Sequence, residues 1–235
     1  MTLLIAGTDT DVGKTFVTVA LTAYWYQYRL QQHNRQNLSI FKLMQTGTGD
    51  VELYQRLFAE YREIEIAAPL RFSAPLAPPI AAAKEGRSID LGLVWQAFNS
   101  AQQKSSIVLL ESLGGLGSPV TEELTVGNIA ADWRLPTVLV VPIKLGAIAN
   151  AVANVALARS LDINLKGIIL NCSQAQSDRE IADLTPINLI QSLTQTPVIG
   201  TLPYIENLEE TVQIARIVSN WDIELILPQP AIRQA

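Results

Sequence analysis

The run from Gly7 to Thr15, GTDTDVGKT, constrains the fold of this chain more than any other feature. It follows the apolar residues 3–6 directly and precedes a stretch of helical character. A strand, a glycine loop ending in Gly-Lys-Thr and a helix together form a cradle for phosphate. The loop N–H groups meet the phosphate oxygens, the lysine reaches the outer phosphates, and the threonine hydroxyl can bind Mg²⁺. The sequence therefore predicts binding of ATP or GTP.

The spacing of this loop differs from the common pattern G-x-x-x-x-G-K-[ST]. Five residues separate Gly7 from Gly13, so the expected first glycine position falls on Thr8. An ordinary glycine-containing turn before a helix is the alternative interpretation. The placement of the loop, after the first hydrophobic run and at the start of a helix, favours the phosphate cradle.

Short apolar runs alternate with helical segments along the whole chain. Runs that are apolar throughout indicate strands buried on both faces of a sheet. The pattern predicts an α/β fold of the P-loop NTPase type: a doubly wound, mainly parallel sheet with helices on both faces and a ligand crevice at the carboxyl ends of the strands. We expect strands at residues 3–6, 39–43, 107–111, 137–142, 167–171 and 198–202, and helices at 14–31, 51–61, 91–103, 125–133, 147–160, 186–193 and 208–218.

The length of 235 residues is that of one domain, which we expect to span 1–226, followed by a fraying tail, 227–235. Residues 67–86 contain four prolines and are expected to form a long connection between elements. His33, the single histidine, lies in a polar stretch and is interpreted as a solvated connection residue.

Composition limits the classes of partner and the compartment. The net charge of −5, without a basic stripe, argues against nucleic acid. No apolar run reaches the ~18 residues of a membrane span, and the first residues are expected to form a strand rather than a secretory leader. A single cysteine, Cys172, fits a reducing compartment, so a cytoplasmic location is expected. Hydrophobic residues at 49% and charged residues at 17% are compatible with self-association.

Polar residues and glycines follow the expected strands at the edge that carries the glycine loop. Taken singly, each is compatible with a solvated rim residue, a turn residue or a helix N-cap. Taken together, they indicate a site, because the carboxyl ends of parallel strands meet at one edge. The residues are Lys42, Thr46, Gly47 and Asp50 after the second strand, Glu111, Gly114 and Gly115 after the third, Lys144 and Gly146 after the fourth, and Asn171 at the end of the fifth.

Two of these carboxylates suit a magnesium ion. A hard cation in a nucleotide site takes one or two carboxylates together with phosphate oxygens and water. Asp50, Glu111 and the Thr15 hydroxyl would supply such ligands. Lys14 and Lys42 would offset the negative charge of a phosphoryl group during its transfer.

The chain resembles the dethiobiotin synthetase family in several segments that occur in the same order. GTDTDVGKT resembles the family's GTDTxVGKT, including the extra residue, and FKLMQTG resembles its YKPxxTG segment. Asp50 stands in the place of the family's aspartate. The segments APLAP, LESLGG, KLG and GTLP resemble its proline-rich connection, VEGAGG, KLG and G-x-[IL]-P. The resemblance runs from Leu3 to about Glu210 and so covers nearly the whole chain.

The resemblance implies a reaction in which 7,8-diaminopelargonate, CO2 and MgATP give dethiobiotin, ADP and phosphate through a carbamate and a carbamic-phosphoric anhydride. It also implies a homodimer with the substrate at the subunit interface. The expected helix after Gly146 is rich in alanine and valine on both faces, which fits an interface element or an ordinary buried helix. Lys14 and Lys42 would be catalytic. The nucleotide site would comprise Asp11, Val12, Gly13, Lys14, Thr15, Phe16, Asp50, Glu111, Gly114, Asn171 and Pro203. Within it, Asn171 and the Pro203 region would contact adenine. The substrate site would comprise Thr46, Lys144 and Gly146. Lys144 can alternatively close a loop.

Several positions depart from the family pattern. Leu43 replaces a proline and is expected to loosen the backbone after Lys42, while Ser112 and Leu113 replace the Gly-Ala that precedes Gly114. Pro79 replaces a frequent histidine. Ala149 stands where an asparagine helps to hold the substrate carboxylate, and whether Asn150 substitutes for it stays open.

Three other classes of protein compete with a synthetase. A partner-regulated P-loop ATPase that acts as a dimer switch usually has a second lysine early in the loop, and residues 8–12 contain none. A related amidase needs a glutaminase domain with a nucleophilic cysteine and a histidine; Cys172 is instead interpreted as a packing residue. A non-catalytic nucleotide-binding module leaves the two carboxylates and the second lysine unexplained.

Overall fold

The computed structural model describes residues 1–29 and 37–227. Its centre is a sheet of seven strands in the order β4-β2-β6-β1-β7-β8-β9, and neighbouring strands run parallel. The predicted strands are all present, and the doubly wound α/β prediction is confirmed. The strands are β1 (Thr2–Gly7), β2 (Leu38–Lys42), β4 (Ile64–Ala67), β6 (Ile107–Gly115), β7 (Thr137–Pro142), β8 (Leu165–Asn171) and β9 (Val198–Leu202).

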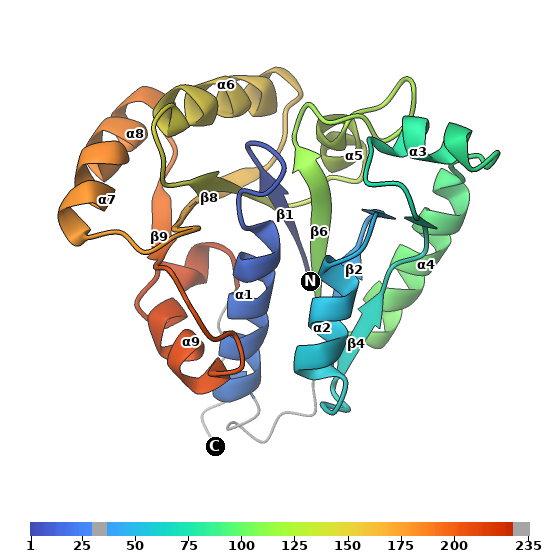
Figure 1. Ribbon diagram of the computed structural model, residues 1–235, viewed down its shortest axis with the longest axis horizontal. Helices are drawn as coiled ribbons and strands as arrows, with labels where there is room; N and C mark the ends of the chain where they lie inside the picture. Colours follow the sequence, from blue (N-terminus) through green and yellow to red (C-terminus); the bar gives the residue numbers. More distant parts are fainter. Residues whose placement is uncertain (30–36, 228–235) are drawn as a thin grey trace.

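Helices cover both faces of this sheet, because strands that are apolar throughout leave no face for water. Figure 1 shows α1 in front of the sheet, with α9 on one side of it and α2 on the other. The helices are α1 (Lys14–Arg29), α2 (Asp50–Phe58), α3 (Pro78–Lys84), α4 (Leu91–Lys104), α5 (Val126–Asp132), α6 (Ala147–Ser160), α7 (Asp178–Leu184), α8 (Ile187–Thr194) and α9 (Thr211–Val218).

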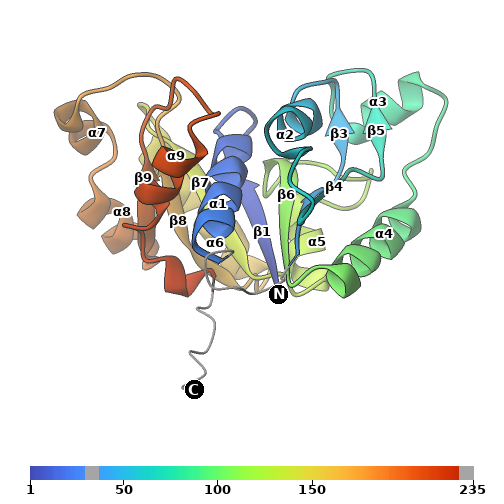
Figure 2. The same cartoon turned by 90° about the horizontal axis from the view of Figure 1, so that it is seen from below.

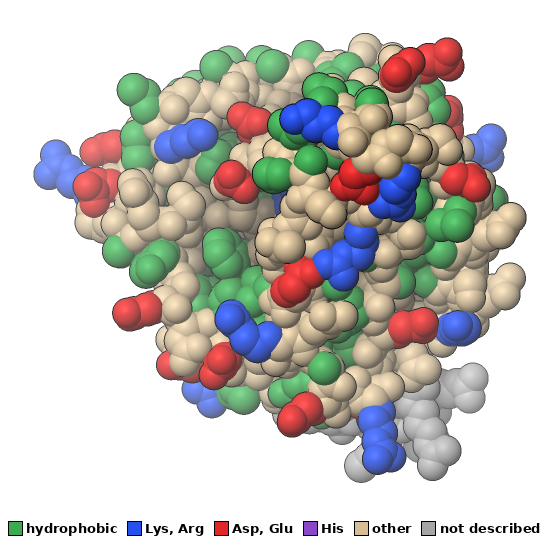
Figure 3. Space-filling view, turned by 45° about the vertical axis from the view of Figure 1, so that its right-hand side comes forward, with side chains coloured by type: hydrophobic (Ala, Val, Ile, Leu, Met, Phe, Trp, Pro, Cys, Tyr) green, Lys and Arg blue, Asp and Glu red, His purple; other side chains and the backbone are tan. Residues whose placement is uncertain are grey.

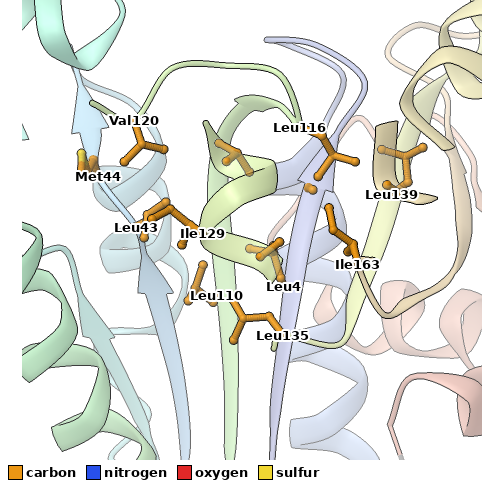
Figure 4. Close-up of a cluster of buried hydrophobic side chains, with 14 of the residues drawn as sticks. Leu4, Leu43, Met44, Leu110, Leu116, Val120, Ile129, Leu135, Leu139 and Ile163 are labelled. Atoms are coloured by element: carbon orange, nitrogen blue, oxygen red, sulfur yellow. The ribbon is translucent and has the colours of Figure 1, made fainter. Parts of the chain in front are cut away.

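The sheet separates two hydrophobic cores. Leu3 and Ile5 of β1 belong to the core beneath α1, α2 and α9, whereas Leu4 belongs to the core beneath α4, α5 and α6. This alternation follows from the two-residue period of a strand. Figure 4 shows the second core, in which Ile129 of α5 and Leu110 of β6 are gathered with Leu4. Both faces of β1 are thus buried, which holds the loop that follows it in place.

The long connection predicted for residues 67–86 is wrong, because this segment contains β5 (Arg71–Phe72) and α3. β5 pairs with β3 (Gln45–Thr46) in a separate two-stranded sheet. Two of the four prolines, Pro78 and Pro79, occupy the first positions of α3, where proline costs no helical hydrogen bond. The prolines therefore begin a helix here.

Two further elements had no sequence prediction. Strand β4 lies at the edge of the sheet and is only partly buried, so its charged residue, Glu65, interrupts the apolar pattern used to recognise strands. Helix α7 has no buried residue and begins with a capping box, in which Ser177 and Glu180 each accept a backbone N–H of the other. Only the partly buried Ile181 and Leu184 pack against the core, so apolar periodicity reveals this helix poorly.

Some predicted boundaries differ from the structure, and others lie outside the described residues. Helix α2 ends at Phe58 instead of residue 61. The described part of α1 ends at Arg29, so its predicted end at residue 31 stays a prediction, and His33 also lies outside the described residues. Helix α9 begins at Thr211 instead of residue 208. The fraying tail cannot begin at Leu227, which is 2% exposed and whose N–H donates to the Ile223 carbonyl at 2.8 Å. Residues 228–235 lie outside the described chain.

The surface carries charges of both signs. On the face shown in Figure 3, lysine and arginine side chains are interspersed with aspartate and glutamate. Within residues 1–29 and 37–227, no helix combines the length and apolar character needed to cross a bilayer.

Candidate active site

The loop between β1 and α1 makes a turn that brings Lys14 back over its own backbone. Asp11 and Gly13 have positive φ angles of 56° and 94°. Such angles are costly for a residue with a Cβ, and non-glycine examples cluster at functional sites. The ammonium of Lys14 donates to the Asp9 carbonyl at 2.9 Å and so closes the loop.

Lys14 lies at the rim of the candidate site with 6% of its surface exposed. Burial lowers the pKa of Lys14 to about 8, and the Glu111 carboxylate opposes this shift. A polyanion bound against the loop would favour the charged form of this lysine.

Lys42 is held between two carboxylates by the register of the sheet. In the parallel pairing of β2 with β6, Lys42 lies directly opposite Glu111. Its ammonium is 2.6 Å from Glu111 Oε1 and 2.5 Å from Asp50 Oδ2, although the residue is only 4% exposed. Burial acts to lower the pKa of Lys42, but the two carboxylates outweigh it and raise the pKa. Lys42 is therefore a buried ammonium ion.

Glu111 is fully buried and lies at the centre of the site. Its Oε1 faces Lys42 and, at 3.1 Å, the Thr15 hydroxyl. Its Oε2 accepts from the Tyr54 hydroxyl and lies 3.2 Å from the Thr18 hydroxyl. Burial raises the pKa of Glu111, and the Lys42 ammonium opposes the rise. Each threonine hydroxyl has a single proton, and a second acceptor lies nearer to it: Asp50 Oδ1 at 2.7 Å from Thr15 and the Lys14 carbonyl at 2.9 Å from Thr18. Lys42 and Tyr54 are therefore the main donors to Glu111.

Three oxygen-bearing side chains meet at one point beside Lys42. The Thr15 hydroxyl oxygen lies 2.7 Å from Asp50 Oδ1 and 3.1 Å from Glu111 Oε1. Burial acts to raise the pKa of Asp50, but the Lys42 ammonium lowers it, so this carboxylate is ionised. One hydroxyl and two carboxylates from three different elements form a hard donor set that fits Mg²⁺.

A cleft of about 890 Å³ opens over these groups. This volume is in the range of sites that bury a small ligand. Its lining also includes the apolar side chains of Met44, Leu53, Leu76 and Leu113. Ten residues expected at the site from the sequence line the cleft: Asp11, Gly13, Lys14, Thr15, Phe16, Lys42, Thr46, Asp50, Glu111 and Gly114.

Five other expected residues lie outside this lining among the described residues. Val12 is buried, and its carbonyl accepts from Asn171 Nδ2 at 3.0 Å. The Oδ1 of Asn171 is buried and has no hydrogen-bond partner in the described chain. Pro203 is exposed after β9, and Lys144 and Gly146 are exposed before α6. The structure thus joins Asn171 to the loop but leaves Lys144 and Gly146 apart from this cleft.

The expected loosening of the backbone at Leu43 is wrong. The Leu43 N–H donates to the Glu111 carbonyl at 3.0 Å, a bond that proline cannot make, and its side chain is fully buried. The next departure, Ser112, is buried with no partner for its hydroxyl in the described chain, and its carbonyl lies 3.4 Å from the Lys42 ammonium. The segments around Lys42 and Glu111 are therefore joined at the backbone as well as by their side chains.

Sequence reasoning missed Thr18 and Tyr54, which both face Glu111. Each has a helical spacing that could have revealed it. Thr18 lies four residues after Lys14 on α1, and Tyr54 lies four residues after Asp50 on α2. Residues four apart share one face of a helix, so both were placed to point at the site.

Comparisons with known proteins agree with this fold and site. Residues 1–212 match a family model described as an AAA domain. A protein of Gloeothece citriformis (strain PCC 7424), named ATP-dependent dethiobiotin synthetase BioD, is 60% identical over 96% of this chain and 98% of its own length. A Synechocystis protein of the same name is 47% identical over 95% of this chain and 93% of its own.

Solved structures with little sequence identity share the fold. A ParA family ATPase from Chlorobium tepidum TLS matches with a TM-score of 0.56 and 13% identity, over 92% of this chain and 89% of its own. The MinC:MinD cell division protein complex of Aquifex aeolicus contains a chain that matches with a TM-score of 0.55 and 16% identity, over 95% and 88%. These likenesses support the P-loop NTPase type of fold.

Proposed function

The chain belongs to the ATP-dependent dethiobiotin synthetase family, and from this premise we propose that it is an ATP-dependent ligase of biotin biosynthesis. It closes the ureido ring of dethiobiotin from 7,8-diaminopelargonate and CO2. The observation that carries the proposal is the meeting of Lys42 with the carboxylates of Asp50 and Glu111 beside the glycine loop.

The proposed reaction has three steps. One amine of the substrate attacks CO2, loses a proton and becomes a carbamate. A carbamate oxygen then attacks the γ-phosphorus of ATP, and ADP leaves. The second amine attacks the carbamoyl carbon, loses a proton and expels phosphate, which closes the ring. Positioning and charge stabilisation suffice for the phosphoryl transfer, so no protein nucleophile is required.

The roles of the charged residues follow from the two anions that must approach each other. Lys14 lies at the loop, where it would contact the outer phosphates, and Lys42 lies across from it, where it would face the carbamate and the γ-phosphoryl group. Thr15, Asp50 and Glu111 would hold Mg²⁺, which supplies positive charge to the phosphates. The described residues contain no group of three His, Cys, Asp or Glu side chains for a metal, so the ion would also need nucleotide oxygens.

The nucleotide base and the rest of the substrate are assigned within the same proposal. Asn171 lies against the loop with a buried, unpartnered Oδ1, which supports a role near adenine together with Pro203. Thr46 lines the cleft and would contact substrate. The proposal includes a single synthetase domain that extends to Leu227, since this residue is buried. It also includes a cytoplasmic location, which the single free thiol of Cys172 supports.

We further propose a homodimer, in which Lys144 and Gly146 complete the substrate site at the interface. Leu145, between them, is 90% exposed, and α6 directly after it is rich in alanine and valine. Light scattering during size exclusion is expected to give twice the chain mass. Leu145→Asp is expected to shift the protein to monomer and reduce turnover, whereas Leu225→Asp, at another exposed leucine, should do neither. A monomeric wild-type protein with full activity contradicts the interface.

The function is tested by mixing the purified protein with diaminopelargonate, bicarbonate and MgATP. We expect a ureido product and ADP in equal amounts, with no product when the diamine is left out. ATP hydrolysis that does not depend on the diamine, without a ureido product, would instead support the dimer-switch ATPase.

A further inference from the structure

Helix α2, which carries Asp50 at its first position, begins without a cap of its own. The N-cap residue is Gly49, with φ 136° and no side chain to accept a hydrogen bond. The first N–H groups of a helix have no partner within it, and an N-cap side chain usually accepts one of them. The backbone angle at Gly49 favours glycine, so the acceptor has to come from elsewhere.

Gln45 supplies the missing acceptor. Its Oε1 accepts from the Val51 N–H at 2.9 Å, the second amide of the helix. Its Nε2 donates to Glu52 Oε2 at 2.9 Å, and the same carboxylate oxygen accepts from the Gly49 N–H at 2.8 Å. Gln45 is 2% exposed, so these bonds do not compete with bulk water.

The two-stranded sheet holds Gln45 in turn. The Gln45 N–H donates to the Leu70 carbonyl at 3.0 Å, next to the pairing of Gln45 with Arg71 in β3 and β5. The Arg71 guanidinium also pairs with Glu52. Figure 2 shows this small sheet beside α2. The start of the helix is therefore fixed, through Gln45, to a segment about 20 residues further along the chain.

The bond from Val51 fixes the peptide unit that follows Asp50. The carboxylate of Asp50 must reach Thr15 and Lys42 at 2.7 and 2.5 Å, and a small rotation at the start of the helix would move it away. We propose that Gln45 is a positioning residue that holds Asp50 in place for the divalent cation by capping α2 from outside the helix. The proposal rests on the proposed function only in taking Asp50 as a ligand of that cation.

The test measures Mn²⁺ binding by electron paramagnetic resonance, with the full chain and a non-hydrolysable ATP analogue. Gln45→Ala is expected to weaken Mn²⁺ binding by about 2- to 30-fold, the range that corresponds to losing an N-cap. In turnover assays the Mg²⁺ concentration for half-maximal rate should rise, while the KM for the diamine stays unchanged. Arg71→Ala is the matched control, because it removes only a partly exposed ion pair of Glu52 and should change Mn²⁺ binding by less than about twofold.

A charge swap separates positioning from a general loss of structure. Gln45→Glu places two carboxylates against each other and should weaken Mn²⁺ binding, whereas Gln45→Glu combined with Glu52→Gln restores one amide and one carboxylate and should recover it. Failure of the swap to recover binding lost in Gln45→Glu would overturn the proposal.

The Asp50→Asn variant distinguishes this proposal from the function on which it rests. If Gln45→Ala binds Mn²⁺ as tightly as the wild type does, and Asp50→Asn no longer binds Mn²⁺, then Gln45 has no positioning role. If Asp50→Asn also binds normally, Asp50 is no ligand, and the proposed metal site fails together with the positioning role. Synthesis of dethiobiotin is not needed for either result.

Discussion

Replacement of Lys42 by alanine is expected to lower kcat by about 10²–10³-fold while ATP still binds. The ammonium lies beside both carboxylates, away from the turn that receives the outer phosphates. Its loss removes positive charge where the carbamate and the γ-phosphoryl group would meet, and leaves the loop and Lys14 unchanged. Steady-state turnover and calorimetric titration with ATP measure the two effects separately.

The control for this variant is Lys104→Ala, which removes an exposed lysine at 3.8 Å from Glu65 on the far end of the fold. Its turnover should equal that of the wild type. Thermal unfolding of Lys42→Ala should be recorded as well, because two carboxylates lose their buried partner. Unchanged turnover in Lys42→Ala would remove this lysine from the mechanism.

Gly13→Ala is expected to weaken ATP binding by at least about tenfold, because it adds two costs of about 1–3 kcal/mol each at the loop. The φ angle of 94° disfavours a residue with a Cβ. The added Cβ would also lie 2.0 Å from Asn171 Nδ2, so Asn171 must move away from the loop. Titration with ATP, followed by calorimetry, measures the loss.

Two further variants divide this effect into its parts. Adding Asn171→Ala to Gly13→Ala removes the collision but keeps the backbone strain. We therefore expect Asn171→Ala to weaken ATP binding less in the Gly13→Ala variant than in the wild type. Gly117→Ala is the matched control, because its Cβ would meet only Leu157 Cδ2 at an ordinary 3.8 Å. ATP binding by Gly13→Ala within twofold of the wild type would show that the loop can rearrange without loss.

The sequence predicted the sheet and the composition of the site because both depend on local patterns. Continuous apolar runs mark strands buried on both faces, and the residues at their carboxyl ends share one edge. Lys42, Asp50 and Glu111 were found in this way, and the structure brings them within hydrogen-bond distance. The resemblance to the dethiobiotin synthetase family is confirmed by the relatives.

The remaining parts of the site depend on contacts between distant segments. The two-residue strands β3 and β5 have no periodicity of their own and form only because they meet. The role of Gln45 as a cap depends on the path of the chain around Gly49. The hydrogen bond from Leu43 to the Glu111 carbonyl follows from the sheet register. These pairings cannot be predicted from the order of residue types along the chain.

The order of strands has a consequence for the way the protein is made. Strand β6 lies between β1 and β2, although it follows both in the chain. On the ribosome, the loop that ends in Lys14 and the strand that ends in Lys42 are therefore synthesised long before the strand that joins them and bears Glu111. In a nascent chain that ends before residue 107, β1 has neither of its neighbours, β6 and β7, and β2 lacks β6 on one side. Unpaired strand edges of this kind are prone to aggregation, so the strand order exposes the early part of the chain to that risk.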